Sequence, residues 1–155
     1  MKNPAKILVF GIIGTTLLVI WLLPYFIAND VSLECFGEKG SCFTGKVTRI
    51  IDGDTIRVND IPIRFALVST PELEEEGGIV AKEFIEKICP VGSIVTVDED
   101  DGQLEGSFDR MIATVHCGDI LLNLAVLENN LGKVDTRFCG KSEFATEDWA
   151  IKFGC

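Results

Sequence analysis

Residues 45–72 read GKVTRIIDGDTIRVNDIPIRFALVSTPE, and this stretch decides the fold. Apolar and polar residues alternate along it, and two turn signals, Asp52-Gly53 and Asn59-Asp60, interrupt the alternation. Alternation with a period of two is typical of half-buried strands, and Asp, Asn and Gly mark the turns between them. The stretch therefore predicts a meander of β-strands over 45–58 and 61–68.

Working outward, the rest of the chain predicts two more strands and three helices. The strands are Ser93–Val97 and Met111–His116, and apolar residues at helical spacing predict Ile79–Ile88, Ile120–Leu131 and Ser142–Ile151. About five strands, interrupted by one helix and followed by two, indicate a mainly β member of the α+β class. The order fits a five-stranded OB-fold barrel with added helices.

Composition limits the kinds of protein that the chain can form. Its 155 residues suit one domain and exclude a large multidomain enzyme, and its 47% hydrophobic content excludes global disorder. The 14 Lys and Arg against 24 Asp and Glu give a net charge of −10. This acidic balance argues against tight, sequence-independent binding to nucleic acid, which needs clustered cations.

The N-terminal segment Ile7–Ala28 carries no charged residue. As a helix it would be about 33 Å long, enough for a bilayer core of about 30 Å. Lys2 and Lys6 precede it and Asp30 and Glu34 follow it, which predicts a cytoplasmic N-terminus. We expect an uncleaved transmembrane anchor. A cleaved signal, whose apolar region should be about 7–15 residues, and a buried helix are the alternatives.

The chain is thus predicted to contain an anchor (1–28), a linker with a small Cys loop (29–44) and a domain (45–155). Both leading interpretations of the first segment export the rest of the chain to the cell surface or beyond. The exported residues 29–155 hold 12 Lys and Arg against 24 Asp and Glu, a net charge of −12. The charge argument against nucleic-acid binding is therefore stronger for this part.

All six cysteines lie in the exported part: Cys35, Cys42, Cys89, Cys117, Cys139 and Cys155. No CxxC pair and no His at zinc spacing accompanies them, so a zinc site is not expected. An even count in a small exported domain indicates disulfides, although six cysteines allow 15 pairings. Local spacing favours pairing Cys35 with Cys42 and Cys139 with Cys155, which leaves Cys89 with Cys117. Reduced, buried thiols are the alternative.

Two short segments carry candidate chemistry. Asp52 and Asp54 flank Gly53 at a strand turn, where oxygen ligands suit a hard cation such as Ca²⁺; an ordinary Asp-Gly turn is the alternative. Arg64 lies among apolar residues of a strand and needs an anionic partner, either a carboxylate or a phosphate. Glu72 follows this strand and could serve as a general base or simply be solvated.

A third segment, Phe108-Asp109-Arg110-Met111, brings a second Arg into a strand after a polar loop. By itself it indicates no more than a surface Arg. The only His, His116, lies at a strand end away from these segments, so we expect no catalytic role for it. The acidic runs 74–76 and 98–101 are interpreted as solvated loops, with loose Ca²⁺ binding as the lesser alternative.

Taken together, the DGDT turn, the Arg strand running into TPE and the later Arg resemble the staphylococcal nuclease (thermonuclease) family. The resemblance covers about residues 45–150. It implies an OB-fold barrel that hydrolyses phosphodiester bonds of DNA and RNA with Ca²⁺. It also implies that Arg64 and Arg110 hold the phosphate and that Glu72 orients or deprotonates the attacking water.

For the metal, the resemblance implies that Asp54 is the main carboxylate ligand, that Thr70 contributes its backbone carbonyl, and that Asp52 lies behind them. Glu143 would be a structural carboxylate. Ser69 stands where the family has a second Asp ligand, and this neutral hydroxyl should weaken Ca²⁺ binding.

The family's Tyr residues around the bound nucleotide are also missing. Phe108, Thr136 and Phe138 occupy those positions, and nucleotide stacking would rest on Phe108 and Phe138.

Two functions follow. We expect an exported, membrane-tethered, monomeric Ca²⁺-dependent nuclease that acts on single-stranded or denatured DNA or RNA. With so acidic a domain, it should bind long nucleic acid weakly and depend strongly on the divalent cation. The alternative is a catalytically weak, nuclease-like module that binds single-stranded nucleic acid or a protein partner. Ser69 and the acidic charge favour the second function, and the retained Arg and Glu residues favour the first.

Overall fold

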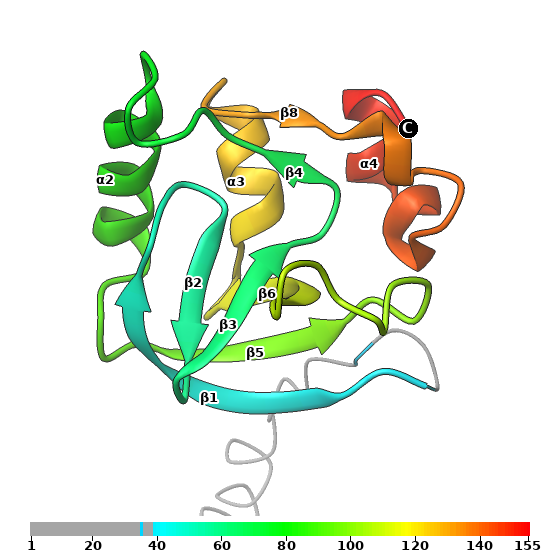
Figure 1. Cartoon of the computed structure of the whole chain (residues 1–155), viewed down its shortest axis with the longest axis horizontal. Helices are drawn as coiled ribbons and strands as arrows, with labels where there is room; N and C mark the ends of the chain where they lie inside the picture. Colours follow the sequence, from blue (N-terminus) through cyan, green and yellow to red (C-terminus); the bar gives the residue numbers. More distant parts are fainter. Residues whose placement is uncertain (1–34, 36–38) are drawn as a thin grey trace, which may run out of the picture. The chain divides into compact units, whose positions relative to one another are not determined.

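The turn residues of the 45–72 stretch produce the strands that they predict. In the computed structural model, which describes Cys35 and residues 39–155, β1 (Cys42–Ile50), β2 (Thr55–Val58) and β3 (Ile61–Phe65) pair as an antiparallel meander (Figure 1). Asn59 and Asp60 both have positive φ, 49° and 65°, as the tight turn of a two-residue hairpin requires. The predicted meander is confirmed.

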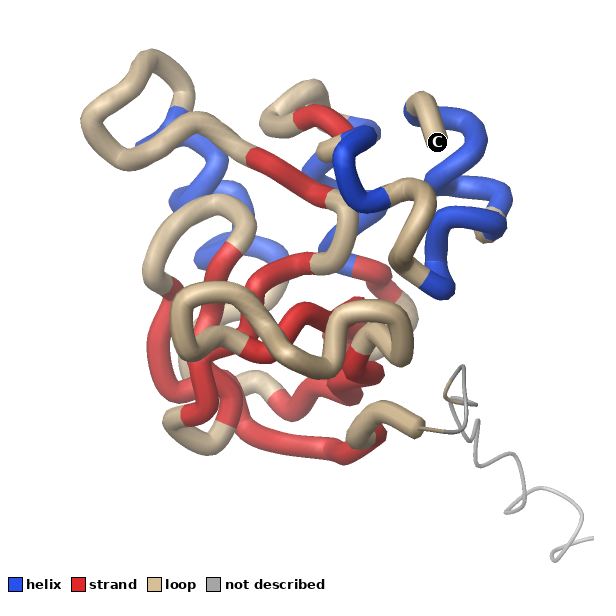
Figure 2. The backbone as a smooth tube through the Cα atoms, turned by 45° about the vertical axis from the view of Figure 1, so that its right-hand side comes forward, coloured by secondary structure: helices blue, strands red, loops and turns tan. Residues whose placement is uncertain are grey.

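A parallel strand pair closes the sheet into a barrel. β5 (Ile94–Glu99) pairs antiparallel with both β1 and β6 (Met111–Cys117), and β6 also pairs in parallel with β3, Ile63 opposite Met111. The result is a five-stranded mixed barrel, consistent with an OB-fold-like domain and with the expected mainly β architecture (Figure 2). A short strand, β7 (Ile120–Leu121), continues the sheet beyond β6.

Helices and two short strands gather beside the barrel, above β1 and β5 in the view of Figure 1. Alternate side chains of the barrel strands, such as Ile56, Ile63 and Val97, fill a core that is closed to solvent. The remaining elements are α2 (Gly78–Ile88), α3 (Leu122–Glu128), α4 (Asp148–Phe153), the paired strands β4 (Val68–Ser69) and β8 (Lys133–Val134), and the 3₁₀ turns η2 (Thr136–Phe138) and η3 (Glu143–Thr146).

Several predicted boundaries differ from the structure. The predicted strand 61–68 ends at Phe65, because Leu67 has φ +61° and turns the chain into β4. The predicted helix 142–151 is divided into η3 and α4 at Glu147, whose backbone is extended. The predicted helix 120–131 is shortened at both ends to α3, because its first two residues form β7 and Asn130, after the C-terminal end of α3, has φ +56°.

Three disulfides bridge the chain, and they join the pairs favoured by local spacing, so that prediction is confirmed. Cys89, fully buried after the C-terminal end of α2, is bonded to Cys117 at the end of β6. Cys139, directly after η2, is bonded to the C-terminal Cys155, and Cys35 is bonded to Cys42. The alternative of reduced, buried thiols is therefore wrong. Three bridges in a domain of this size indicate an extracellular or secreted setting.

The predicted anchor, 7–28, lies outside the described residues. Within the part of the chain that the structure describes, no helix has the length and apolar character to cross a membrane. Cys35–Cys155 forms one compact unit, and its first strand begins at Cys42, three residues before the predicted start of the domain.

A single buried amide joins α3 to the closure of the barrel. Asn123 is fully buried; its Oδ1 accepts from the Val115 amide at 3.1 Å, and its Nδ2 donates to the carbonyls of Ala66 (3.0 Å) and Ala113 (3.3 Å). Ala66 directly follows β3 and Ala113 lies in β6, so one side chain joins β6 to the end of β3. If these backbone groups lost their hydrogen-bond partners, they would remain buried away from water, and this would destabilise the folded state.

Replacing this amide should therefore cost stability. We expect Asn123→Ala to lower the free energy of unfolding by about 3 kcal/mol, because it leaves buried backbone groups unpaired. Chemical denaturation of the full chain measures the change. Asn129→Ala, which removes an exposed bond to Ala125, is the matched control and should change stability by about 0.5 kcal/mol or less. Equal effects of the two variants would contradict the role given to Asn123.

Candidate active site

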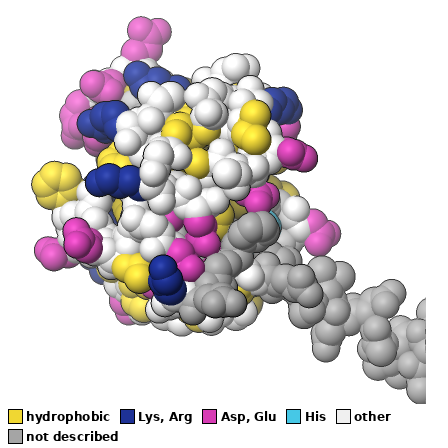
Figure 3. All heavy atoms as spheres, turned by 90° about the vertical axis from the view of Figure 1, so that its right-hand side faces the viewer, with side chains coloured by type: hydrophobic (Ala, Val, Ile, Leu, Met, Phe, Trp, Pro, Cys, Tyr) yellow, Lys and Arg dark blue, Asp and Glu magenta, His cyan; other side chains and the backbone are white. Residues whose placement is uncertain are grey.

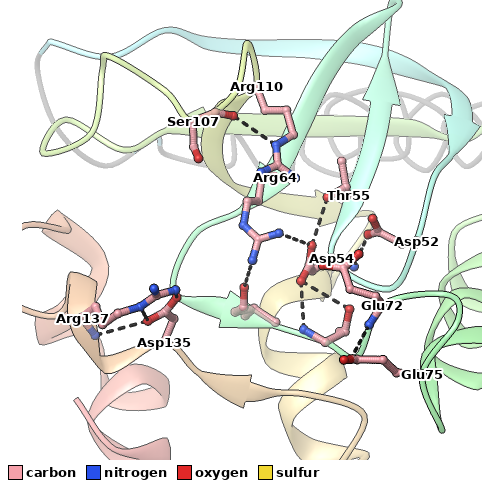
Figure 4. A network of polar contacts seen from close by, with 12 residues as sticks. Asp52, Asp54, Thr55, Arg64, Glu72, Glu75, Ser107, Arg110, Asp135 and Arg137 are labelled. Carbon is pink, nitrogen blue, oxygen red and sulfur yellow. Dashed lines mark hydrogen bonds and ion pairs between the residues drawn. The ribbon is translucent and has the colours of Figure 1, made fainter.

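A cavity of about 410 Å³ brings together the three residues predicted to be catalytic: Arg64, Glu72 and Arg110. They come from three separate segments, β3, the loop after β4 and the residue before β6 (Figure 4). Phe108, Phe138 and Ser69 line the same cavity.

The parallel strand pair brings the two arginines to one place, Arg64 in β3 and Arg110 directly before β6. In the β3–β6 register, Arg64 lies opposite Ile112, two residues after Arg110. Inward-facing neighbours in β3, Ile63 and Phe65, are buried, so the side chain of Arg64 emerges from the opposite face at about one-fifth exposure. Nε of Arg110 donates to the carbonyl of Ser107 at 3.1 Å, which orients the guanidinium in the wall of the cavity.

Asp54 lies behind Arg64 and is almost completely buried. Its Oδ1 accepts from Nη1 of Arg64 at 2.7 Å and from the Thr55 hydroxyl at 3.0 Å. Its Oδ2 accepts from the amide of Thr70 at 2.9 Å and from the Thr70 hydroxyl at 3.3 Å. Four donors occupy the roughly four lone-pair positions of a carboxylate. The contact with the Thr70 hydroxyl is long for an O–H···O bond and is therefore the weakest.

The turn that carries Asp54 depends on a glycine. A Cβ atom at Gly53 would lie 2.5 Å from the Cβ of Ala81 in α2 and 2.9 Å from the Thr70 hydroxyl, so only glycine permits this close approach. Next to it, Asp52 accepts from the amide of Asp54 at 3.0 Å. Burial, with repulsion from Asp54 and Glu72, raises the pKa of Asp52. Three carboxylates thus concentrate negative charge at one edge of the site.

The loop after β4 presents Glu72 to solvent and to the cavity. Its amide donates to the carboxylate of Glu75 at 3.0 Å, and the amide of Glu75 donates to its carbonyl at 2.9 Å. These reciprocal bonds hold the loop while leaving the Glu72 carboxylate at the cavity. Ser69 lines the cavity one residue before Thr70, so it lies beside the amide that bonds Asp54.

Phe108 is held in an unusual backbone conformation at the mouth of the cavity. Phe108 and Asp109 both have positive φ, 52° and 60°, and form a two-residue turn between Ser107 and Arg110, which exchange both backbone hydrogen bonds. A bulky residue in this region costs of order 1–3 kcal/mol. The turn leaves Phe108 91% exposed, with the centre of its ring 5.7 Å from the guanidinium carbon of Arg110.

Two residues of the site have no counterpart in the sequence-based prediction. Asp135 and Arg137 also line the cavity, and Figure 4 shows them on the side of Arg64 away from Asp54 and Glu72. The guanidinium of Arg137 lies 5.5 Å from the ring of Phe138. The sequence pattern that could have indicated them is Asp135 two residues before Arg137, followed directly by the aromatic Phe138.

His116, predicted to be outside the site, lines none of the three cavities found around β4 and β8 in the described residues. It pairs with Thr96 and Leu121 near the end of β6. Burial lowers its pKa.

The acidic run 98–101 is not a solvated loop, and that expectation was wrong. Asp98 and Asp100 are buried; Oδ1 of Asp100 accepts from the amides of Gly102 and Glu143, and Oδ2 accepts from the side-chain amide of Gln103 at 2.8 Å. Glu143 in turn accepts from the amide of Asp101 at 2.8 Å. These bonds attach η3 to the loop between β5 and β6.

This acidic contact makes stability depend on pH. Burial, with repulsion from Asp101, Asp100 and Asp98, raises the pKa of Glu143. A carboxyl whose pKa is raised in the folded state binds more protons there than in the unfolded state, so stability falls as pH rises from about 4.3 through the raised pKa.

Glu143→Gln keeps an acceptor for Asp101 but removes the charge. We expect it to be more stable than the parent at pH 7 by a margin that shrinks toward pH 4, as measured by denaturation across that range. Glu105→Gln, the same charge change at an exposed position, is the control. A margin independent of pH, or matched by the control, would contradict the assignment.

The fold is a five-stranded mixed barrel, consistent with an OB-fold-like domain, and its cavity is lined by arginines and carboxylates. No family model matches the chain, and no curated protein is similar enough to match it.

Proposed function

We propose that the chain is a Ca²⁺-dependent nuclease that hydrolyses phosphodiester bonds of DNA or RNA by attack of water. The observation that supports this most is the convergence of Arg64, Arg110 and Glu72 on one cavity from three separate segments. A phosphodiester is an anion, and its hydrolysis needs cations where charge grows and a base for the attacking water. The resemblance of the DGDT, TPE and Arg segments to the thermonuclease family supports the same reaction.

Each side chain has a role that its surroundings allow. Arg64 and Arg110 bind the non-bridging phosphate oxygens and stabilise the charge that develops on them. Arg64 is oriented for this by Asp54 and by the carbonyl of Val68, 3.4 Å from its Nη2. The exposed carboxylate of Glu72 orients a water molecule and accepts its proton. Phe108 and Phe138 offer ring faces on which bases stack.

The donor atoms at Asp54 suit Ca²⁺ in their chemistry. Asp54, the Thr70 carbonyl and Asp52 are oxygen donors of the kind that Ca²⁺ takes, and three nearby carboxylates supply negative charge. Asp54 would hold the cation, with Thr70 and Ser69 beside it; bound Ca²⁺ would supply charge neutralisation and polarisation of the phosphate. Among the described residues, the one group of three ligand side chains within 4.8 Å is Cys35, Cys42 and Asp98, whose cysteines are bridged.

Binding of Ca²⁺ at Asp54 has a cost. Because its four acceptor positions are occupied, the cation must displace at least the long bond from the Thr70 hydroxyl. Ser69 adds no charge. We therefore propose a weakly binding site.

The occupied Asp54 carboxylate is also the observation that favours the second candidate function, a catalytically weak module that binds single-stranded nucleic acid or a protein. On the face shown in Figure 3, acidic side chains lie beside the basic ones, which argues against tight binding of a long polyanion. The disulfides agree with an exported domain, and the apolar segment 7–28 is proposed to tether it to the membrane.

Removing the proposed base distinguishes the two functions. With the purified full chain, denatured DNA and millimolar Ca²⁺, we expect hydrolysis that EDTA abolishes. Glu72→Gln should lower kcat by about 10²–10⁴-fold, the usual contribution of general acid–base catalysis. Glu74→Gln, in the same acidic run but outside the three cavities, should retain activity. If the unmodified protein is as inactive as Glu72→Gln, the nuclease function is rejected and the binding module remains as the proposed function.

Restoring a carboxylate beside Asp54 tests the metal site independently of activity. We expect Ser69→Asp to lower the Kd for Ca²⁺ roughly tenfold, because the affinity of such sites rises with the number of charged ligands. Calorimetric titration with Ca²⁺ measures the Kd, and the Ca²⁺-induced rise in Tm provides a second reading. Ser69→Asn, neutral and similar in size to Asp, controls for packing. Equal Kd values for the two variants would place the cation elsewhere.

A further inference from the structure

The cavity continues past the proposed reaction centre to a third arginine. Arg137 lines the same 410 Å³ space as Arg64 and Arg110, and it also lines an adjoining cavity of about 380 Å³ with Lys133 and Ser69. Of the 12 Lys and Arg in residues 29–155, four border these two cavities. In so acidic a domain, cations at one place are the feature that a polyanion would recognise.

Arg137 is held in place although its side chain is 79% exposed. Its Nε and Nη2 donate to the two carboxylate oxygens of Asp135 at 2.8 and 2.6 Å, and its amide donates to the same carboxylate at 3.3 Å. The ring of Phe138 lies 5.5 Å from its guanidinium carbon. A surface Arg normally loses rotamer freedom when it binds a ligand, and this one is already ordered.

The pairing with Asp135 leaves part of the guanidinium available. Asp135 uses two of its five N–H donors, so three remain for a ligand. The hydrogen bond from Arg137, helped by the charges of Arg137 and Arg64, lowers the pKa of Asp135, so this carboxylate stays ionised and keeps both bonds. Asp135 therefore orients Arg137 while sharing its charge between two arginines.

We propose that Arg137 binds a second phosphate of the same nucleic-acid strand, next to the phosphate held by Arg64 and Arg110. The inference rests on the proposed function and deepens it: the substrate is an oligonucleotide with at least two consecutive phosphates rather than an isolated phosphodiester. A guanidinium with free N–H groups matches phosphate oxygens, whereas the nearby ring of Phe138 offers a face to a base.

Arg137→Gln tests the proposal with two substrates. We expect its KM for a short single-stranded oligonucleotide to rise about tenfold, the usual effect of losing one charge-assisted hydrogen bond, with kcat unchanged. Its KM for a dinucleoside monophosphate, which has one phosphate, should match that of the parent. Arg49→Gln is the control, because Arg49 is exposed on β1 and lines none of the three cavities. An equal rise for both substrates, or no rise, would overturn the proposal.

Binding measured without turnover separates this proposal from the proposed function. In EDTA, the slope of log K for oligonucleotide binding against log salt concentration should become about 0.7 less steep for Arg137→Gln, as expected for the loss of one phosphate contact to a single strand. The slope should change by less for Arg49→Gln. If the parent does not hydrolyse the oligonucleotide but the two variants still differ in slope, the proposed nuclease activity is rejected and the role of Arg137 is kept. Equal slopes for the two variants, or no binding by the parent, would reject the role of Arg137.

Discussion

The parallel pairing of β3 with β6 is the constraint on which the rest of the structure depends. Four of the five strand contacts in the barrel are antiparallel, and two of them link consecutive strands of the meander. The fifth joins strands that are far apart in the sequence and lets the sheet close. Because Arg64 lies in β3 and Arg110 directly precedes β6, the same pairing that closes the barrel also assembles the cationic half of the cavity.

The acidic half of the site is bound to this framework by the 2.7 Å contact between Asp54 and Arg64. A buried carboxylate without a partner would be costly, so Arg64 contributes to folding as well as to any reaction. Asp54 is in turn fixed by the amide of Thr70, which positions the segment leading to Glu72. Two of the groups proposed to act on a phosphate, Arg64 and Glu72, are therefore connected through one buried side chain.

Local signals allowed much of the fold to be predicted, but the candidate site only in part. Asn59-Asp60 favours the positive φ that a two-residue hairpin needs, and close spacing identified two of the three disulfides. Burial of Asp100, in contrast, follows from the amide of Glu143, 43 residues later, and nothing local distinguishes such an acid from a solvated one. The sequence did not identify Arg137 as a site residue, because it reaches the cavity only through the pairing of β4 with β8. Each of these strands is two residues long, which is too short to show the alternation that predicts a strand.

The turn at Phe108 has a consequence for protein engineering. Phe108 has a positive φ, which Gly and Asn adopt at a lower energetic cost than Phe. Its ring is exposed and therefore contributes nothing to the hydrophobic core. A directed-evolution screen for heat resistance would therefore favour replacing Phe108, whereas a screen for ligand capture would favour keeping it. Opposite outcomes of the two screens at this one position would show that the chain gives up stability there in exchange for a surface that can meet a ligand.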